Sequence, residues 1–167
     1  MKFLKEICID PEVECKEYKV KRTARAILMN DNNEIALLHA TNGDWYELVG
    51  GKLEENDTHE KALKRECLEE VGAKIEILDE VGVVIEFRNT FKTIKINHCY
   101  CAKILGKLGQ QSLTESENEY GIVLEFHTIE NAIALIKSTK PFGENEMVGK
   151  YMLASEIIFL EEYLNRE

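Results

Sequence analysis

The stretch from residue 50 to residue 73 constrains the fold more than any other part of this 167-residue sequence. It begins with the pair Gly50-Gly51, passes through an acidic segment and continues into residues 58–71, which contain neither proline nor glycine. A glycine pair favours a turn or a close approach of the backbone, and an uninterrupted run without helix breakers favours a helix. The pattern therefore predicts a glycine turn followed by a helix.

Both ends of this helix carry capping signals. Asp57 can serve as the N-cap, and Glu60 follows three residues later in the manner of a capping box. Gly72 fits the position just past the C-terminus, where a left-handed backbone conformation is favoured. We therefore expect a helix that begins after Asp57 and ends before Gly72.

Two carboxylates interrupt the apolar stripe of this helix. At about 100° per residue, one side of the helix holds, in angular order, Ala62, Glu66, Glu70, Leu63, Cys67 and Val71. Glu69 lies at the edge of this stripe. An ionised carboxylate that is buried without a partner costs several kcal/mol, so Glu66 and Glu70 require a cation. Three clustered oxygen donors suit a hard divalent ion such as Mg²⁺ or Mn²⁺ far better than zinc.

A solvated acidic helix is the alternative interpretation of the same residues. Charge runs usually face water, and pairs such as Glu60 with Lys64 have the i, i+4 spacing that stabilises an exposed helix. The position of Glu66 and Glu70 inside the apolar stripe, after a glycine pair, favours the metal site.

A fixed spacing runs through this stretch. Gly51 is followed by five residues and Asp57, then by seven residues and the run RECLEEVGA of residues 65–73. This spacing resembles the Nudix box of the Nudix (MutT-like) hydrolases. The resemblance covers about residues 22–137, and it implies an α+β fold, the α/β/α Nudix sandwich around a mixed sheet.

Three positions depart from the family pattern. Asp57 stands where a glutamate is usual, Cys67 replaces an aliphatic residue, and Ala73 is small for the last position. Cys67 behaves as a small hydrophobe when it is buried. Asp57 keeps the charge of glutamate but has a shorter reach, so its pairing with Arg65 depends on whether the side chain extends far enough.

The resemblance also implies roles for individual residues. Glu66 and Glu70 would be the principal metal ligands, and Glu69 would be a further ligand or the base that takes a proton from water. The backbone carbonyl of Gly50 would be an additional ligand. Arg65 would orient the carboxylates.

A polar loop over residues 106–118 precedes the next predicted strand. In the resembled family a glutamate from such a loop often adds a metal ligand or a base. Glu115, Glu117 and Glu119 are the candidates, and Glu119 is the first choice. The alternative is a solvated acidic loop that takes no part in the chemistry.

Trp45 opens a short predicted strand, residues 45–49, that leads into the glycine pair. The main interpretation is packing at the start of this strand. Stacking on a substrate base is the alternative, which makes Trp45 a candidate substrate-binding residue.

The rest of the chain alternates strands with helices. Residues 22–29 and 34–39 predict a hairpin around a turn of asparagine and aspartate, and residues 74–87 predict a strand with Gly82 as a possible bulge. The pattern also predicts strands over residues 91–105 and 119–127 and helices over residues 128–137 and 145–165.

These elements indicate one domain over residues 1–167. Its core spans about residues 22–137, and its last helix spans residues 145–165. Residues 1–21 form an N-terminal extension that pairs as an edge strand or wraps around the domain.

The composition limits the partners and the compartment. A formal net charge of −10 argues against nucleic acid, whose phosphates are held by patches of lysine and arginine. No apolar run approaches the length that spans a membrane. Five cysteines without a Cys-x-x-Cys motif indicate reduced thiols and a cytoplasmic protein.

Three cysteine and histidine side chains form a further candidate site. Cys99 and Cys101 share one face of the predicted strand over residues 91–105, and with His98 they are a weak candidate for a soft-metal site. Core or surface thiols are the alternative.

The functional hypothesis is a Mg²⁺-dependent or Mn²⁺-dependent pyrophosphohydrolase that acts on a nucleoside diphosphate linked to another group. Two alternatives share the fold: a module that senses a nucleotide without cleaving it, and an isomerase that acts on an isoprenoid diphosphate. The fold alone does not choose between them. A homodimer is compatible with the sequence, which does not identify the nucleotide.

Overall fold

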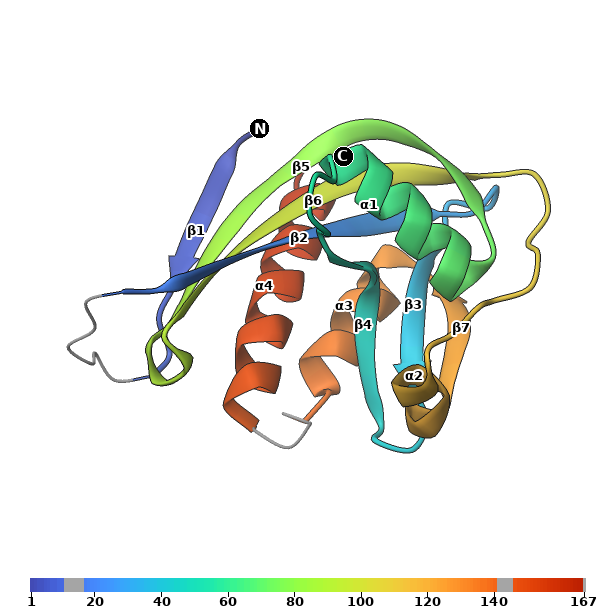
Figure 1. Ribbon diagram of the computed structural model, residues 1–167. Coiled ribbons are helices and arrows are strands. Elements are labelled where there is room, and N and C mark those ends of the chain that lie inside the picture. The colour runs from blue at the N-terminus through green and yellow to red at the C-terminus, as the bar shows by residue number, and fades with distance from the viewer. Residues whose placement is uncertain (11–16, 141–145, 167) are drawn as a thin grey trace.

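The computed structural model describes residues 1–10, 17–140 and 146–166. Across these residues seven strands form one mixed sheet in the order β1-β5-β6-β2-β4-β3-β7 (Figure 1). The strands are β1 (Phe3–Ile7), β2 (Lys19–Met29), β3 (Ile35–Ala40), β4 (Trp45–Lys52), β5 (Lys74–Arg88), β6 (Thr93–Leu105) and β7 (Ile122–His127). The helices are α1 (His59–Glu66), the π-helical turn η1 (Cys67–Val71), the 3₁₀ turn η2 (Asn89–Phe91), α2 (Glu115–Tyr120), α3 (Ile129–Ser138) and α4 (Glu146–Leu164).

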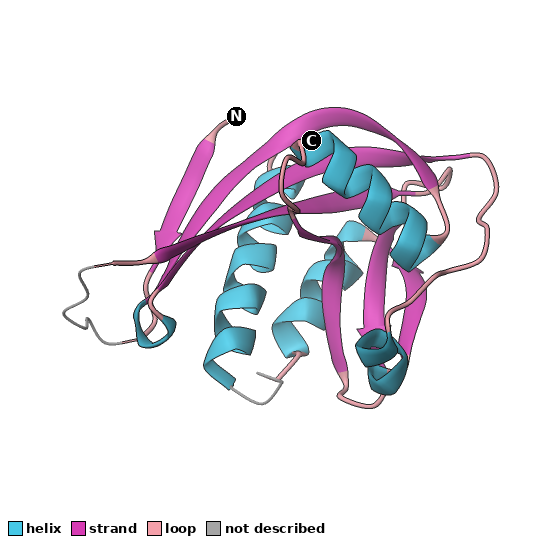
Figure 2. Ribbon diagram, viewed as in Figure 1, coloured by secondary structure: helices cyan, strands magenta, loops and turns pink. Residues whose placement is uncertain are grey.

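Helices cover both faces of the sheet. Helix α1 lies across one face, in contact with β2, β4 and β5, while α3 and α4 cover the other face (Figures 1 and 2). Each face has its own apolar cluster. The α1 side is built around residues such as Leu28, Leu38 and Leu63, and the α3/α4 side around Leu37 and Phe159. The predicted α/β/α sandwich with a mixed sheet is confirmed.

The central strand β2 determines how the sheet is connected. It runs parallel to β6 over its whole length and antiparallel to β4 from Thr23 to Ala26. β2 and β3 meet through the pair Met29 and Ile35, so the predicted hairpin is a small part of the pairing of β2. The N-terminal segment contributes β1, an edge strand parallel to β5, which is one of the two arrangements expected for it.

Several boundaries differ from the sequence prediction. Gly50 and Gly51 do not form a turn, because β4 continues through both glycines to Lys52. Residues 115–120, predicted as loop and strand, form α2, which is capped by Thr114. The predicted bulge is present, since the register of β5 shifts between Glu80 and Gly82. The last helix begins at Glu146, and position 145 lies outside the described residues.

The soft-metal hypothesis is wrong. Cys99 and Cys101 are buried in the cluster on the α3/α4 side. His98 projects from the opposite face of β6, because side chains alternate along a strand, and its ring stacks on His59 of α1 with ring centroids 3.9 Å apart.

Candidate active site

The strand that carries the glycine pair is the floor of the candidate site. Gly50 has a φ of +126°, a conformation that favours glycine. A Cβ atom on Gly50 would collide with the backbone of Ala24, and one on Gly51 would collide with the carboxylate of Glu66. The glycines therefore allow β2 and the side chain of Glu66 to lie directly against β4.

The helix above this floor begins one residue later than predicted. Thr58 is the N-cap, and its hydroxyl accepts a hydrogen bond from Lys61 N at 3.2 Å. Asp57 does not cap the helix, because its carboxylate pairs with Lys61 Nζ at 2.8 Å and lies 3.5 Å from Arg65 Nη2. The shorter side chain at this position therefore does reach Arg65.

The end of the helix differs in type from the prediction. After Glu66 the chain widens into the π-helical turn η1, which ends at Gly72 with a φ of +70°, so the predicted left-handed cap is confirmed. π-Helical turns inside helices are rare and are frequent at functional sites. This turn carries Glu69 and Glu70.

The loop after β6 holds η1 in place. Ser112 N donates to the carbonyl oxygen of Glu69 at 2.7 Å, and the side-chain amide of Gln111 donates to that of Glu70. Gly109 N donates to the carbonyl oxygen of Gly72 at 2.8 Å. These contacts satisfy backbone groups that a helix end leaves unpaired. No local sequence pattern indicated them.

The three box carboxylates differ in exposure. Glu70 is 6 % exposed, and its Oε2 accepts a hydrogen bond from Gly50 N at 2.8 Å. The side chain of Glu66 is 13 % exposed and that of Glu69 is 46 % exposed. Burial raises the pKa of Glu66, and burial together with the nearby carboxylate of Glu47 raises the pKa of Glu70 well above its usual range. The burial agrees with the positions expected from the apolar stripe.

Arg65 faces these carboxylates from the open side. Its Nη1 lies 2.8 Å from Oε1 of Glu66 and 3.4 Å from Oε2 of Glu69. Its Nη2 donates to the carbonyl oxygen of Lys52 at 3.2 Å. The guanidinium thus connects the helix to the end of β4, which fits the orienting role expected for it.

The donor set fits a hard divalent cation by its chemistry. Carboxylates from Glu66, Glu69 and Glu70 lie on the side of β4 that faces α1; Glu70 is buried, Glu66 is half-buried, and the pKa of each of these two is raised, which a bound cation would offset. Among the residues that the structure describes, no three His, Cys, Asp or Glu side chains already surround one point. Glu66 and Glu69 face Arg65 instead, so both would turn toward a cation.

Beneath the glycine pair lies a buried charged group that the sequence analysis missed. Arg25 of β2 is 9 % exposed, and its Nη1 donates to the carbonyl oxygens of Leu48, at 2.8 Å, and Gly50. Its Nη2 lies 3.3 Å from Glu47 and its Nε 3.9 Å from Glu156 of α4. The only sequence signal was an arginine inside an apolar β-strand.

The remaining predicted residues lie further out. Glu119 is exposed on α2, and its carbonyl oxygen accepts a hydrogen bond from Asn42 at 2.7 Å. Glu117 is half-buried, and its charge adds to the burial that raises the pKa of Glu47. Trp45 is 6 % exposed and packs in the α1-side core with its edge toward Tyr120, as the packing interpretation expects.

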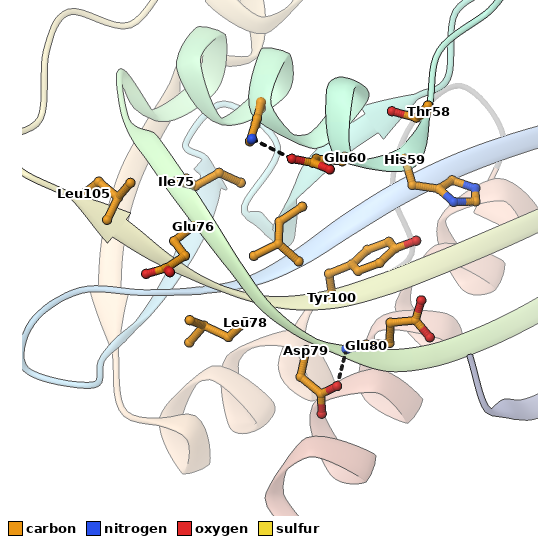
Figure 3. Close-up of a pocket in the computed structure, with 12 residues that line it drawn as sticks. Thr58, His59, Glu60, Ile75, Glu76, Leu78, Asp79, Glu80, Tyr100 and Leu105 are labelled. Carbon is orange, nitrogen blue, oxygen red and sulfur yellow. Dashed lines mark hydrogen bonds and ion pairs between the residues drawn. The ribbon is translucent and has the colours of Figure 1, made fainter.

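A separate cavity of about 830 Å³ lies on the other flank of α1, against β5 and β6 (Figure 3). Ile75, Leu78 and Leu105 form apolar parts of its wall, and Glu80 and Tyr100 lie at the end near His59. None of the box carboxylates lines it. The cavity is therefore distinct from the candidate site.

Comparison with known proteins identifies the family. The family model of the NUDIX domain matches residues 19–145. No curated protein sequence matches the chain at a significant level. The chain belongs to the NUDIX domain family, so the sequence prediction of a Nudix (MutT-like) hydrolase is confirmed.

Solved structures show the same fold at low identity. The chain is similar to the ORF135 protein of E. coli, with a TM-score of 0.63, 20 % identity and coverage of 89 % of this chain and 91 % of that one. It is also similar to the MutT protein from Methanosarcina mazei Go1, with a TM-score of 0.60, 17 % identity and coverage of 91 % of this chain and 98 % of that one. A third similar structure is an ADP-ribose pyrophosphatase from Streptococcus suis 89-1591, with a TM-score of 0.53, 17 % identity and coverage of 86 % of this chain and 91 % of that one.

Proposed function

We propose that this Nudix hydrolase uses Mg²⁺ or Mn²⁺ to cleave the pyrophosphate bond of a nucleoside diphosphate linked to another group. The observation that carries the proposal is the placement of the half-buried Glu66 and the buried Glu70 against the Gly50-Gly51 backbone, with both pKa values raised. Two carboxylates that are withdrawn from water and repel each other are costly unless a cation joins them. This unfavourable electrostatic energy lies at the position where a cation would bind and neutralise a diphosphate.

The chain's own residues divide the work. Glu66 and Glu70 would hold the cation, with Glu69 as a third donor and the carbonyl oxygen of Gly50 as a fourth. Glu69 is the most exposed of the three carboxylates, so it is also the best placed to take a proton from an attacking water. Arg65 would keep Glu66 and Glu69 oriented through the contacts already described.

A bound cation would supply charge neutralisation on the bridging phosphate oxygens and lower the pKa of a water molecule. The protein carries a formal charge of −10, so its carboxylates alone would repel a diphosphate. Glu117 is the structure's candidate for an additional donor or base, beside the sequence's first choice, Glu119. The substrates that the similar proteins' names indicate include ADP-ribose and UDP-linked compounds.

Steady-state hydrolysis tests the proposal. The panel contains ADP-ribose, a UDP-sugar, a dinucleoside polyphosphate and a nucleoside triphosphate, each assayed with Mg²⁺, with Mn²⁺ and with chelator. We expect one class to be hydrolysed only with a cation, and Glu69→Gln to lose about 10²-fold or more in kcat, as for removal of a general base. Glu76→Gln, an exposed glutamate on β5, is the matched control and should keep full activity.

Hydrolysis that persists in chelator, or full activity of Glu69→Gln, would contradict these roles. One observation favours a second candidate, the nucleotide sensor: Glu66 and Glu69 face Arg65 rather than a common point. Calorimetry on the same panel separates the two functions, because a sensor would bind a nucleotide in the presence of cation and release it unchanged after hours.

A further inference from the structure

The backbone of Gly50 is held from both faces of the sheet. On the α1 face, Gly50 N donates to Oε2 of Glu70 at 2.8 Å. Its carbonyl oxygen accepts a hydrogen bond from the guanidinium of Arg25. Gly50 pairs with Arg25 in the β2–β4 ladder, but its φ of +126° is unusual for a strand, so these two contacts help to fix the peptide units on either side of it.

Arg25 is suited to this task by its shape. One terminal nitrogen donates to two carbonyl oxygens, of Leu48 and Gly50, and the other lies 3.3 Å from Glu47. The planar guanidinium presents its donors in a fixed fork, which a lysine ammonium does not reproduce. A carbonyl oxygen has two lone pairs, so the contact from Arg25 leaves one of them on Gly50 for a cation.

The carboxyl groups of Glu47 and Glu156 lie next to the buried guanidinium of Arg25. Burial opposes the charge of the guanidinium, but Glu47, Glu156 and the box glutamates outweigh burial and raise the pKa of Arg25 above its ordinary value. Glu156 is 1 % exposed and comes from α4, 131 residues away in the sequence. Neither of its carboxyl oxygens makes a well-formed hydrogen bond among the described residues, and its Oε1 lies 3.9 Å from Arg25 Nε.

Helix α4 is fixed in register at this point. Ser155, next to Glu156, donates to the fully buried carboxylate of Glu86 on β5, and Asn97 of β6 donates to the same carboxylate at 2.7 Å. Met152, one turn earlier on α4, lies with its sulfur 3.7 Å from Arg25 Nη2. The helix therefore cannot shift along the sheet without breaking a buried polar contact.

We propose that Arg25 is a positioning residue for the metal site, and that Glu47 and Glu156 hold it in place. By holding the carbonyl oxygens of Leu48 and Gly50, Arg25 sets the position of the oxygen that would face the cation and steadies the N–H of Gly50 that holds Glu70. The C-terminal helix thereby determines the geometry of the box carboxylates without touching them. This inference rests on the proposed function of the same site.

Metal affinity without substrate is the primary test. Mn²⁺ binding to the full chain is measured by electron paramagnetic resonance for wild type, Arg25→Lys, Arg25→Met/Glu156→Leu and Glu156→Gln. We expect both Arg25 variants to bind Mn²⁺ about 10- to 100-fold more weakly, the usual effect of removing a group that orients a metal ligand. Arg22→Met is the control, since Arg22 is exposed on the same strand and should leave affinity unchanged.

The variants separate positioning from stability. Arg25→Lys keeps the charge and loses the fork, whereas Arg25→Met/Glu156→Leu removes both partners together and avoids leaving Glu156 without Arg25. Circular dichroism confirms folding. At saturating Mg²⁺ we expect kcat to fall while KM for the nucleotide changes less than twofold, because Glu70 stays misplaced and the substrate surface is intact.

Each outcome decides the inference. Mn²⁺ affinity within twofold of wild type in a folded Arg25 variant overturns it. If both Arg25 variants are unfolded, Glu156→Gln decides when it is measured above pH 8, where Glu156 is ionised, because this near-isosteric variant should then bind Mn²⁺ severalfold more weakly, and wild-type affinity would overturn the proposal. A wild-type protein that binds no Mn²⁺ would instead refute the proposed function. Tight wild-type binding with insensitive Arg25 variants would refute the positioning role alone.

Discussion

Two buried glutamates approach the same piece of backbone from opposite faces of the sheet. Glu70 comes from the turn after α1 and is 6 % exposed, and Glu156 comes from α4 and is 1 % exposed. Glu70 accepts a hydrogen bond from Gly50 N at 2.8 Å, whereas Glu156 lies 3.9 Å from Arg25 Nε, with Glu47 and Lys95 also near it. The same type of side chain therefore has different surroundings on the two faces of the sheet at Gly50.

The difference shows how one residue type acquires two roles. Glu70 stands beside Glu66 and the more exposed Glu69, so a cation can reach its side of the sheet. Glu156 is enclosed between α4 and the strands, and burial raises its pKa to about 8. We infer that Glu70, next to the box carboxylates, belongs to the chemistry, and that Glu156 belongs to the support beneath it.

Exchanging each glutamate for glutamine gives the largest expected contrast. Glu70→Gln should lower kcat by about 10³-fold, because losing a metal ligand removes several kcal/mol of transition-state stabilisation at about 1.4 kcal/mol per tenfold. Glu156→Gln should cost less than about tenfold, since it acts through Arg25. Steady-state kinetics with Mg²⁺ measures both. Equal losses in the two variants would end the distinction between the faces.

Stabilisation by cation offers an independent comparison. A ligand that binds only the folded state adds about 2.7 kcal/mol to the free energy of unfolding when its concentration is 100 times Kd. Mg²⁺ should therefore raise the Tm of wild type in thermal unfolding, and it should raise the Tm of Glu70→Gln by less. Glu156→Gln, as the matched variant, should keep most of the increase. A Glu70→Gln protein that Mg²⁺ stabilises as much as wild type would show that the cation binds elsewhere.

The pH dependence of stability should identify the enclosed glutamate. The pKa of Glu156 is raised by burial from 4.5 to about 8 in the folded protein, so the folded state retains a proton that the unfolded chain releases. The free energy of unfolding of wild type should therefore fall as pH rises through this window, by up to about 1.4 kcal/mol per pH unit.

Glu156→Gln removes this contribution and should flatten the curve between pH 5 and pH 8. Arg25, Glu47 and Lys95 face Glu156 from β2, β4 and β6 and also influence its charge, so the difference between variant and wild type is the relevant quantity. Denaturant unfolding at several pH values measures it. Parallel curves for the two proteins would refute a proton on Glu156.

The glycines permit a smaller and more local test. Gly51→Ala places a Cβ against the carboxylate of Glu66 and should lower kcat about tenfold, as for displaced metal ligands. Gly106→Ala should lower stability and leave activity unchanged. Gly106 has a φ of +74° and open space around it, so the substitution should cost about 1 kcal/mol of stability. Kinetics and thermal unfolding of both variants check the pair. Loss of activity in Gly106→Ala would indicate a general effect on folding.

Some of the site could be predicted because its signals are local. The placement of Glu66 and Glu70 in an apolar stripe follows from helical periodicity, and Gly72 ends the turn as a left-handed cap. Even so, competition between neighbours shifted the helix start. Thr58 caps the helix because the carboxylate of Asp57 is occupied by Lys61 and Arg65. Propensity alone does not resolve such a competition.

The sequence by itself determined the box: its carboxylates, their spacing and the helix that presents them. Only the tertiary structure decided what holds the box in place. Arg25, Gly50 and Glu156 meet because β2 pairs with β4 and α4 packs beneath them, and these pairings join segments far apart in the chain. In the sequence, Arg25 and Glu156 are charged residues that interrupt apolar patterns. Only the packing of α4 against β2 shows that they are partners.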